Sequence, residues 1–159
     1  MKTYRSSSSE ETKRLGYKIA KETRNSKLET RNWRKGALVF ALQGELGAGK
    51  TTFVQGFLRG LGIKRRSASP TFIIFRRFRI GRKSLVVSRQ SFRNVYHVDA
   101  YRIKKPRELL ALGFKEILSD PQNIVLIEWA ENIKRILPKE TTWLRFAHGK
   151  KQNERTIGG

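Results

Sequence analysis

A glycine-rich loop between an apolar segment and an amphipathic segment is the feature that most constrains how this chain can fold. Residues 37–42 form a short continuous apolar run, which is typical of a strand buried on both faces of a parallel sheet. Residues 44–51 read GELGAGKT, and residues 50–61 carry apolar side chains on one side of a predicted helix that ends at Gly62. A strand, a glycine-rich loop and a helix in this order, followed by mixed strands and helices, predict an α/β fold in which a mixed sheet is flanked by helices.

The loop matches the phosphate-binding pattern G-x-x-x-x-G-K-[ST] at every position. Glycines let the backbone wrap around an anion with its N–H groups pointing inward, and the start of the following helix adds positive potential. Lys50 is expected to reach the β- and γ-phosphates of a nucleotide, and Thr51 to bind Mg²⁺. The alternative is an ordinary glycine-rich turn. The predicted cofactor-binding residues of the loop are Gly44, Leu46, Gly47, Ala48, Gly49, Lys50, Thr51 and Thr52.

Two acids follow predicted strands, where a phosphate-binding loop needs a carboxylate to organise Mg²⁺. Glu128 comes directly after the apolar residues 124–127, and Asp99 comes directly after residues 95–98. Either acid could instead be a helix cap or a surface carboxylate. The spacing leaves open which acid holds the metal and which orients water, although Glu128 has the more typical setting for a metal ligand. The candidate catalytic residues are Lys50, Asp99 and Glu128, and the candidate metal ligands are Thr51, Glu128 and Asp99.

Four further side chains near these motifs each admit two interpretations. Thr71, in Ser-Pro-Thr, is either a sensor of the γ-phosphate or a turn hydroxyl. Arg102 either supplies charge to the transferring phosphate or lies on the surface. His97 shares a strand face with Asp99 and is either a packed side chain or a general base, and Trp129 is either core or a contact surface.

Strong positive charge points to anionic partners. The chain has 35 Lys and Arg against 13 Asp and Glu, a formal net charge of +22. The excess fits a nucleic-acid partner, non-specific affinity for polyanions, or a general bias toward basic residues. Part of it is local, because residues 71–98 contain no acid and residues 76–93 form a basic hairpin-like stretch with a turn at Gly81.

Length and composition exclude several classes of protein. The 159 residues predict one domain, residues 1–159, and the absence of cysteine excludes disulfide frameworks and thiolate sites. Two histidines argue against a dedicated zinc site. The sequence has no apolar stretch typical of a signal peptide or a membrane span, so a cytoplasmic protein with no membrane partner is expected.

The remaining elements are predicted from caps and apolar runs. A helix is expected over residues 8–24, since the serines at residues 6–9 offer a hydroxyl cap and Glu10 and Glu11 lie in its first turn. Further strands are expected at residues 71–75, 92–98, 124–127 and 141–147, with helices opening at Pro106 and covering residues 132–137.

Four motifs, in the order GELGAGKTTF, SPTF, HVDAYR and LIEWAE, resemble those of the TsaE family, the bacterial ATPases of tRNA threonylcarbamoyladenosine biosynthesis. The resemblance runs over residues 8–155, and the last three motifs make it more specific than the phosphate-binding loop alone. It implies a P-loop fold, weak ATP hydrolysis with Mg²⁺ and a cytoplasmic protein. It also implies a partnership with the transferase subunit and its inactive paralogue, which place threonylcarbamoyl on adenosine 37 of tRNA, while ATP turnover supports repeated cycles.

The resemblance also assigns roles to single residues. Lys50 and Thr51 match the phosphate and magnesium residues, Glu128 the magnesium-binding acid and Asp99 a required acid. Thr71 lies in the family's switch-like loop. The segment around Thr12 and the late basic position of Arg155 match regions near the nucleotide.

The sequence departs from the family pattern in three places. Ala100 replaces a usual leucine, the final strand is expected to be short, and the basic insertion after SPTF is longer than usual. We expect this hairpin, residues 76–93, to contact tRNA or an acidic partner face. Two other functions remain open: a small-molecule or nucleoside kinase, and a nucleic-acid-binding module in which the phosphate-binding loop is secondary.

Overall fold

A mixed β-sheet forms the centre of the molecule. The computed structural model describes residues 3–25, 36–64, 74–81 and 92–159, and within them seven strands form one sheet in the order β1-β7-β6-β2-β5-β4-β3. Neighbouring strands β6, β2, β5 and β4 are parallel, whereas β1, β7 and β3 run antiparallel to their neighbours. The predicted mixed sheet is therefore confirmed. The strands are β1 (Tyr4–Ser6), β2 (Leu38–Gly44), β3 (Phe75–Arg79), β4 (Asn94–Asp99), β5 (Asn123–Glu128), β6 (Thr142–His148) and β7 (Arg155–Gly158).

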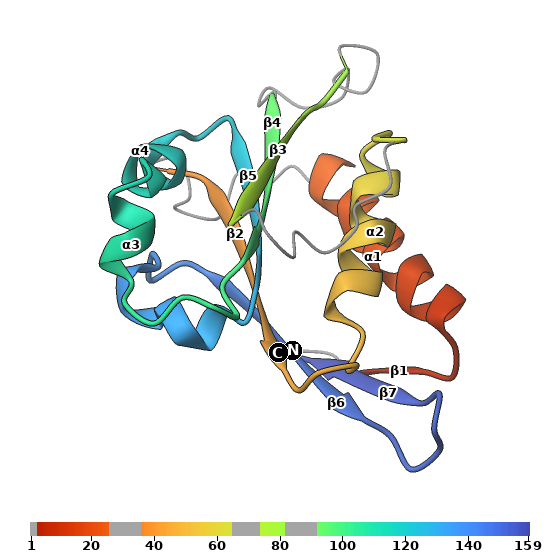
Figure 1. The fold of residues 1–159 in the computed structure, drawn as a ribbon. Coiled ribbons are helices and arrows are strands. Elements are labelled where there is room, and N and C mark those ends of the chain that lie inside the picture. Colours follow the sequence, from red (N-terminus) through yellow and green to blue (C-terminus); the bar gives the residue numbers. More distant parts are fainter. Residues whose placement is uncertain (1–2, 26–35, 65–73, 82–91) are drawn as a thin grey trace.

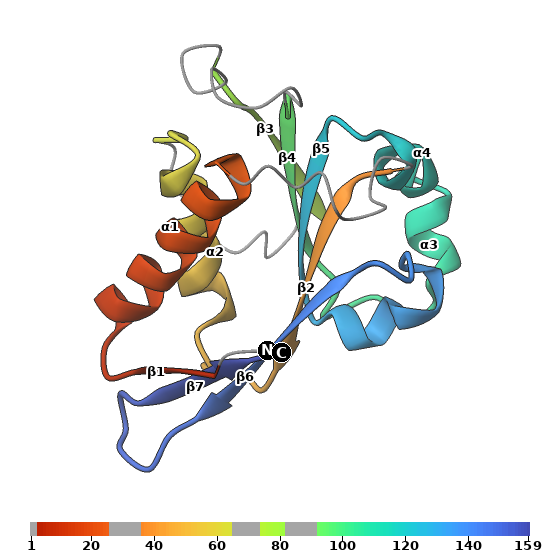
Figure 2. The same cartoon turned by 180° about the vertical axis from the view of Figure 1, so that it is seen from behind.

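Helices cover both faces of the sheet (Figures 1 and 2). On one face lie α1 (Ser9–Asn25) and α2 (Lys50–Gly60), and on the other lie α3 (Arg107–Leu110), α4 (Phe114–Ser119) and the 3-10 helix η3 (Ala130–Ile136). The central strand β2 is apolar and buried from Leu38 to Leu42 because successive side chains serve two cores: Phe40 packs on the α2 side, and Val39 on the α3–α4 side. None of the helices in the described ranges is both long and apolar enough to cross a membrane.

Glycines bring α1 and α2 into close contact. A Cβ atom at Gly56 would lie 2.0 Å from the backbone oxygen of Lys13, and one at Gly16 would lie 2.3 Å from the oxygen of Phe53. Only glycine permits this approach. It holds the first turns of α1 close to the loop that precedes α2.

The predicted helix ends follow their capping residues. Helix α1 begins one residue after Ser8, whose Oγ accepts the N–H of Glu11 at 3.2 Å, and the Glu11 carboxylate accepts the N–H of Ser7 at 2.7 Å. Helix α2 ends at Gly60, and the following Gly62 adopts φ 81°. The N–H of Ile63 then donates to the oxygen of Leu58 at 3.0 Å, which completes a glycine-based C-terminal cap.

The basic stretch at residues 76–93 begins within β3 and ends just before β4. These strands pair antiparallel, and the N–H of Ile80 extends the ladder by donating to Arg93 O at 2.9 Å. Of the strand predicted for residues 71–75, the structure describes only Ile74 and Phe75: Ile74 is not in a strand, and β3 runs from Phe75 to Arg79, into the basic stretch. Residues 71–73 and 82–91 lie outside the described part of the chain.

Several elements differ from or add to those predicted. The helix expected for residues 132–137 is a 3-10 helix that begins earlier, at Ala130, and the helix opening at Pro106 is only the short α3. Helix α4 and the edge strand β1 were not predicted from the sequence, and β7 was expected only as the family's final strand. The final strand is short, as expected. The prediction that residues 1–159 form one domain stays a prediction.

Candidate functional site

The glycine-rich loop connects β2 to α2 and adopts a conformation that requires glycine. Gly44, Gly47 and Gly49 have φ values of 145°, 73° and 99°. At Gly44 an added Cβ would also lie 2.2 Å from the backbone oxygen of Phe146 on β6. Positive φ at these positions lets the loop curl around the start of α2, which is the backbone arrangement of a phosphate-binding loop.

Lys50 lies inside this loop. Its side chain is only 4% exposed, and Nζ donates to the backbone oxygens of Gly44 and Glu45. Nζ also lies 3.8 Å from the ring centroid of Trp129. Burial lowers the pKa of Lys50, and the carboxylates of Glu128, Glu131 and Asp99 partly oppose this shift. A buried lysine held by loop carbonyls has its ammonium group where an anionic ligand of the loop would need it.

Glu128 links the loop to the neighbouring strand. It lies at the carboxyl end of β5, opposite Leu42 of β2, and is 3% exposed. Thr51 Oγ1 donates to Glu128 Oε2 at 2.7 Å, and the fully buried His97 contacts Glu128 Oε1 through Nε2, also at 2.7 Å. Asp99 ends β4 directly opposite Glu128. The strand ends thus bring together the two acids and the threonine that the sequence singled out.

These residues fit a magnesium ion of the phosphate-binding-loop type. Mg²⁺ prefers oxygen ligands and is usually held by one or two protein oxygens, with water and substrate phosphates completing its coordination. A hydroxyl and a carboxylate oxygen 2.7 Å apart, Thr51 Oγ1 and Glu128 Oε2, are such a donor set. The described ranges contain no cluster of three or more His, Cys, Asp or Glu residues suited to a metal, and a site of this type does not need one.

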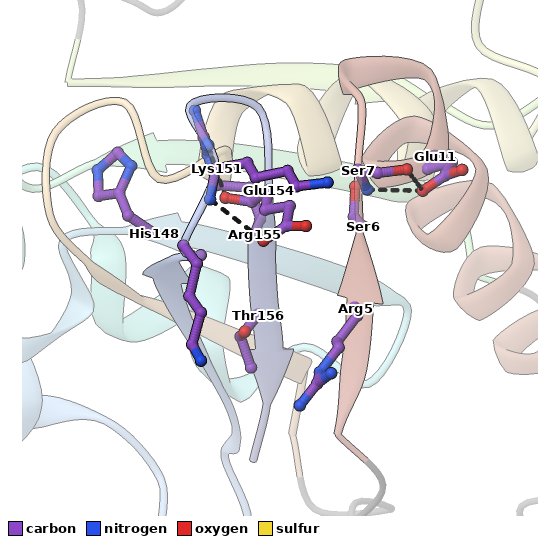
Figure 3. A pocket seen from close by; sticks show the side chains of 11 residues that line it. Arg5, Ser6, Ser7, Glu11, His148, Lys151, Glu154, Arg155 and Thr156 are labelled. Carbon is purple, nitrogen blue, oxygen red and sulfur yellow. Dashed lines mark hydrogen bonds between the residues drawn. The ribbon is translucent and has the colours of Figure 1, made fainter.

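A pocket opens on the other side of the loop. The cavity of about 640 Å³ lies between β1, the start of α1 and the β6–β7 hairpin (Figure 3). Arg155 Nε donates to Gly47 O at 3.1 Å, and His148 Nε2 donates to Leu46 O at 3.1 Å, so the β6–β7 wall of the pocket is fixed to the loop at two points. It is lined by Arg5, Ser6, Ser7, Glu11, His148, Gly149, Lys150, Lys151, Glu154, Arg155 and Thr156.

Comparison with known proteins decides the family. The family described as threonylcarbamoyl adenosine biosynthesis protein TsaE matches residues 6–157. The chain belongs to the TsaE family. The protein named tRNA threonylcarbamoyladenosine biosynthesis protein TsaE from Rickettsia prowazekii (strain Madrid E) is 39% identical over 126 residues, which cover 72% of this chain and 77% of the relative. The protein of the same name from Bacillus subtilis (strain 168) is 42% identical over 102 residues, which cover 64% of this chain and 56% of the relative.

A solved structure supports the same fold. The crystal structure of Bacillus subtilis YdiB superposes with a TM-score of 0.67 at 30% identity and covers 98% of this chain and 82% of that protein. The P-loop NTPase-like fold predicted from the sequence is therefore confirmed.

The structure describes two of three further residues that the sequence singles out. Thr71 lies outside the described ranges. Thr12 is 1% exposed, bonds the hydroxyl of Ser6 at 2.8 Å, and would lie 3.5 Å from a Cβ at Gly49, so it is next to the loop. Arg102 is exposed on the turn after β4.

Other loop residues differ in exposure. Ala48 is fully buried, whereas Leu46 is 80% exposed. Thr52 is half-buried on the first turn of α2.

Trp129 combines the two roles that the sequence left open. It packs partly against the core, and its ring also lies 4.9 Å from that of the exposed Tyr101 and covers Lys50. Its φ of 57° is unusual for a residue other than glycine, and no other non-glycine residue in the described ranges has positive φ.

Sequence reasoning missed two features of this site. The first is the contact between His97 and Glu128, which depends on the register between the adjacent strands β4 and β5. The second is the pocket wall that contains Arg5, Ser7 and His148, which depends on pairing between β1 and β7. No motif marks these wall residues.

Proposed function

We propose that this TsaE-family protein is the Mg²⁺-dependent ATP-binding and ATP-hydrolysing subunit of the complex that installs threonylcarbamoyl on adenosine 37 of tRNA. In this role its ATP turnover supports repeated cycles of the transferase subunit. The observation that carries the proposal is the hydrogen bond of 2.7 Å between Thr51 and Glu128, which joins the glycine-rich loop to an acid on the neighbouring strand.

The phosphate side of the site supports ATP as the ligand. Backbone N–H groups of residues 44–49 and the ammonium group of Lys50 would bind the phosphates, after Lys50 exchanges its loop carbonyls for phosphate oxygens. Thr51 and Glu128 would hold Mg²⁺, which neutralises phosphate charge when bound. Asp99 would orient water or assist at the metal, since it lies at the same strand end.

The pocket next to the loop supports binding of the adenosine part of ATP. Its volume of about 640 Å³ is within the usual range for small-ligand sites. Thr12 and Arg155 lie between this pocket and the loop, so one ligand could contact both. We propose that Thr12 and Arg155 bind the nucleotide at this junction of the loop and the pocket.

Membership of the TsaE family supports a proposal about partners. We infer that the chain works with the transferase subunit and its inactive paralogue, and that the basic hairpin contacts tRNA or an acidic face of these partners. Exposed arginines on the described part of the hairpin support this, namely Arg77, Arg79 and Arg93.

The test combines nucleotide binding, turnover and complex formation. Binding of ADP is measured by calorimetry with Mg²⁺ and with EDTA, and ATP hydrolysis is measured with and without the transferase pair. Lys50→Ala and Glu128→Ala should abolish hydrolysis while the fold survives, and Glu140→Ala, an exposed acid, should leave hydrolysis unchanged. A pull-down with the transferase pair, with and without ATP, tests the partnership.

The alternatives give different results. Wild-type turnover in both site variants would refute the proposal. Rapid ADP formation that depends on a nucleoside or another small acceptor would favour a kinase. Tight RNA binding without nucleotide, with a steep loss of affinity as salt rises, would favour a nucleic-acid-binding module.

A further inference from the structure

We propose that His97 is a positioning residue for the magnesium ligand Glu128, and that it fixes the orientation of the Glu128 carboxylate. The inference rests on the proposed function, because it gives His97 a task in the same Mg²⁺–ATP site. It concerns a side chain that the sequence left as either a packed histidine or a general base.

Strand register places the two side chains on one face. In the parallel pair of β4 and β5, His97 lies opposite Leu126 and Asp99 lies opposite Glu128. His97 and Glu128 are thus diagonal neighbours, a relation in which only long side chains meet. They meet through atoms near the ends of both side chains: His97 Nε2 lies 2.7 Å from Glu128 Oε1.

Both carboxylate oxygens of Glu128 have a donor, and the two donors come from different elements. Thr51 Oγ1 on α2 donates to Oε2, and His97 Nε2–H on β4 donates to Oε1, since a carboxylate oxygen only accepts. Two donors from separate directions restrict rotation of the carboxylate about its last bond. Because Thr51 is itself a proposed metal ligand, His97 is the donor to Glu128 that does not bind the metal.

The surroundings of His97 favour this function over simple packing. His97 is 0% exposed and lies on the face of the sheet where Val95, Ile124 and Leu126 belong to the core. Burying an imidazole there costs free energy unless it is hydrogen-bonded, and an aliphatic side chain would fill the space without that cost. Partners that orient metal ligands typically change metal affinity by 10- to 100-fold when they are removed.

Two amide variants separate positioning from packing. His97→Gln places an amide N–H at the distance of the imidazole Nε2, whereas the shorter side chain of His97→Asn stops near the position of Nδ1 and does not reach Glu128. Each variant is saturated with ADP, and the affinity for Mn²⁺ is measured by electron paramagnetic resonance of the free ion. Affinity for ADP in EDTA is measured separately, and thermal melting checks the fold.

We expect His97→Asn to weaken Mn²⁺ binding about tenfold. His97→Gln should stay close to the wild type, and both variants should bind ADP in EDTA as the wild type does. Ile124→Val is the matched control, because it perturbs the same core without touching Glu128.

The inference is overturned if the wild type and His97→Asn bind Mn²⁺ equally, or if both amide variants lose the same affinity. It is also overturned if His97→Asn loses as much affinity for ADP in EDTA as for Mn²⁺, since that marks a purely structural role. Should His97→Asn not fold, His97→Leu, which has no donor and suits the apolar surroundings, takes its place. A wild-type protein that binds neither ADP nor Mn²⁺–ADP would instead refute the proposed function.

Discussion

Adding one methyl group at Gly56 tests whether the close contact between α1 and α2 holds the nucleotide site together. In Gly56→Ala the new Cβ would lie 2.0 Å from the backbone oxygen of Lys13, and 2.7 Å from both its carbonyl carbon and its Cα. Ordinary contact begins at 3.4 Å. All three atoms belong to the backbone of α1, so no side-chain rotation relieves the overlap and the helices must move apart by about 1 Å.

The expected magnitude is the difference between two effects. Alanine gains about 1 kcal/mol over glycine in a helix interior. Overpacking costs about 1–3 kcal/mol and sometimes more, and this overlap is with rigid backbone at the deepest part of the contact. We therefore expect a net loss of about 2 kcal/mol, which lowers the melting temperature by roughly 4–8 °C in a chain of this size.

The assay is urea unfolding and thermal melting followed by circular dichroism, together with ADP binding. ADP affinity should also fall, because Thr12 on α1 lies next to Gly49 of the loop and moves with the helix. Gly81→Ala is the control, since an added Cβ there meets nothing within 4 Å. A Gly56→Ala protein as stable as the wild type would refute the role of this contact, and unchanged ADP affinity in a destabilised variant would refute its link to the site.

Three further predictions concern the cap, the loop lysine and the hairpin. Ser8→Ala removes the cap of α1 and should lower stability by about 1 kcal/mol in urea unfolding, and an equal loss in Ser9→Ala would contradict this. The pKa of Lys50 is lowered, so ADP affinity by calorimetry should fall as pH rises, earlier than for an ordinary lysine with its pKa of 10.5, because phosphate binding needs the charged form. Affinity that stays constant up to pH 10.5 would count against that shift. Arg79→Glu with Arg93→Glu should weaken binding of tRNA or of the partner pair and reduce its salt dependence, and unchanged binding over a salt series would contradict the role of the hairpin.

The sequence predicted the parts of this structure that local chemistry determines. The run at residues 37–42 becomes β2 because alternate side chains such as Val39 and Phe40 enter two cores, and the glycines of the loop are needed for its positive φ values. The short edge strands β1 and β7 carry no such signal. They are three and four residues long, and their place in the sheet depends on pairing between distant segments: β7 pairs with β6, and β1 pairs with β7.

The residues of the candidate site also divide into those that a local pattern predicts and those that depend on contacts between distant segments. Motif spacing found Thr51 and Glu128, because a buried strand that ends in an acid is a local pattern. It could not find that His97 contacts Glu128, since this depends on the register between two strands that are far apart in the sequence. Thr12 and Arg155 were predicted to lie near the nucleotide from the family resemblance alone, and the structure shows both next to Gly49 of the loop, brought there by the packing of α1 and by the β1–β7 pair.

The two sides of the loop are physically separate, and this separation makes the proposed functions distinguishable. On one side, His97 and Glu128 lie on the parallel strands β4 and β5, inside the sheet. On the other side, Thr12 and Arg155 come from α1 and the antiparallel edge of the sheet. The hydrogen bonds of the Lys50 ammonium group go to the carbonyl oxygens of Gly44 and Glu45 in the loop, not to the His97–Glu128 pair or to the residues that line the pocket. A defect on the strand side should therefore change affinity for the metal, whereas a defect on the edge side should change affinity for the nucleotide whether or not metal is bound.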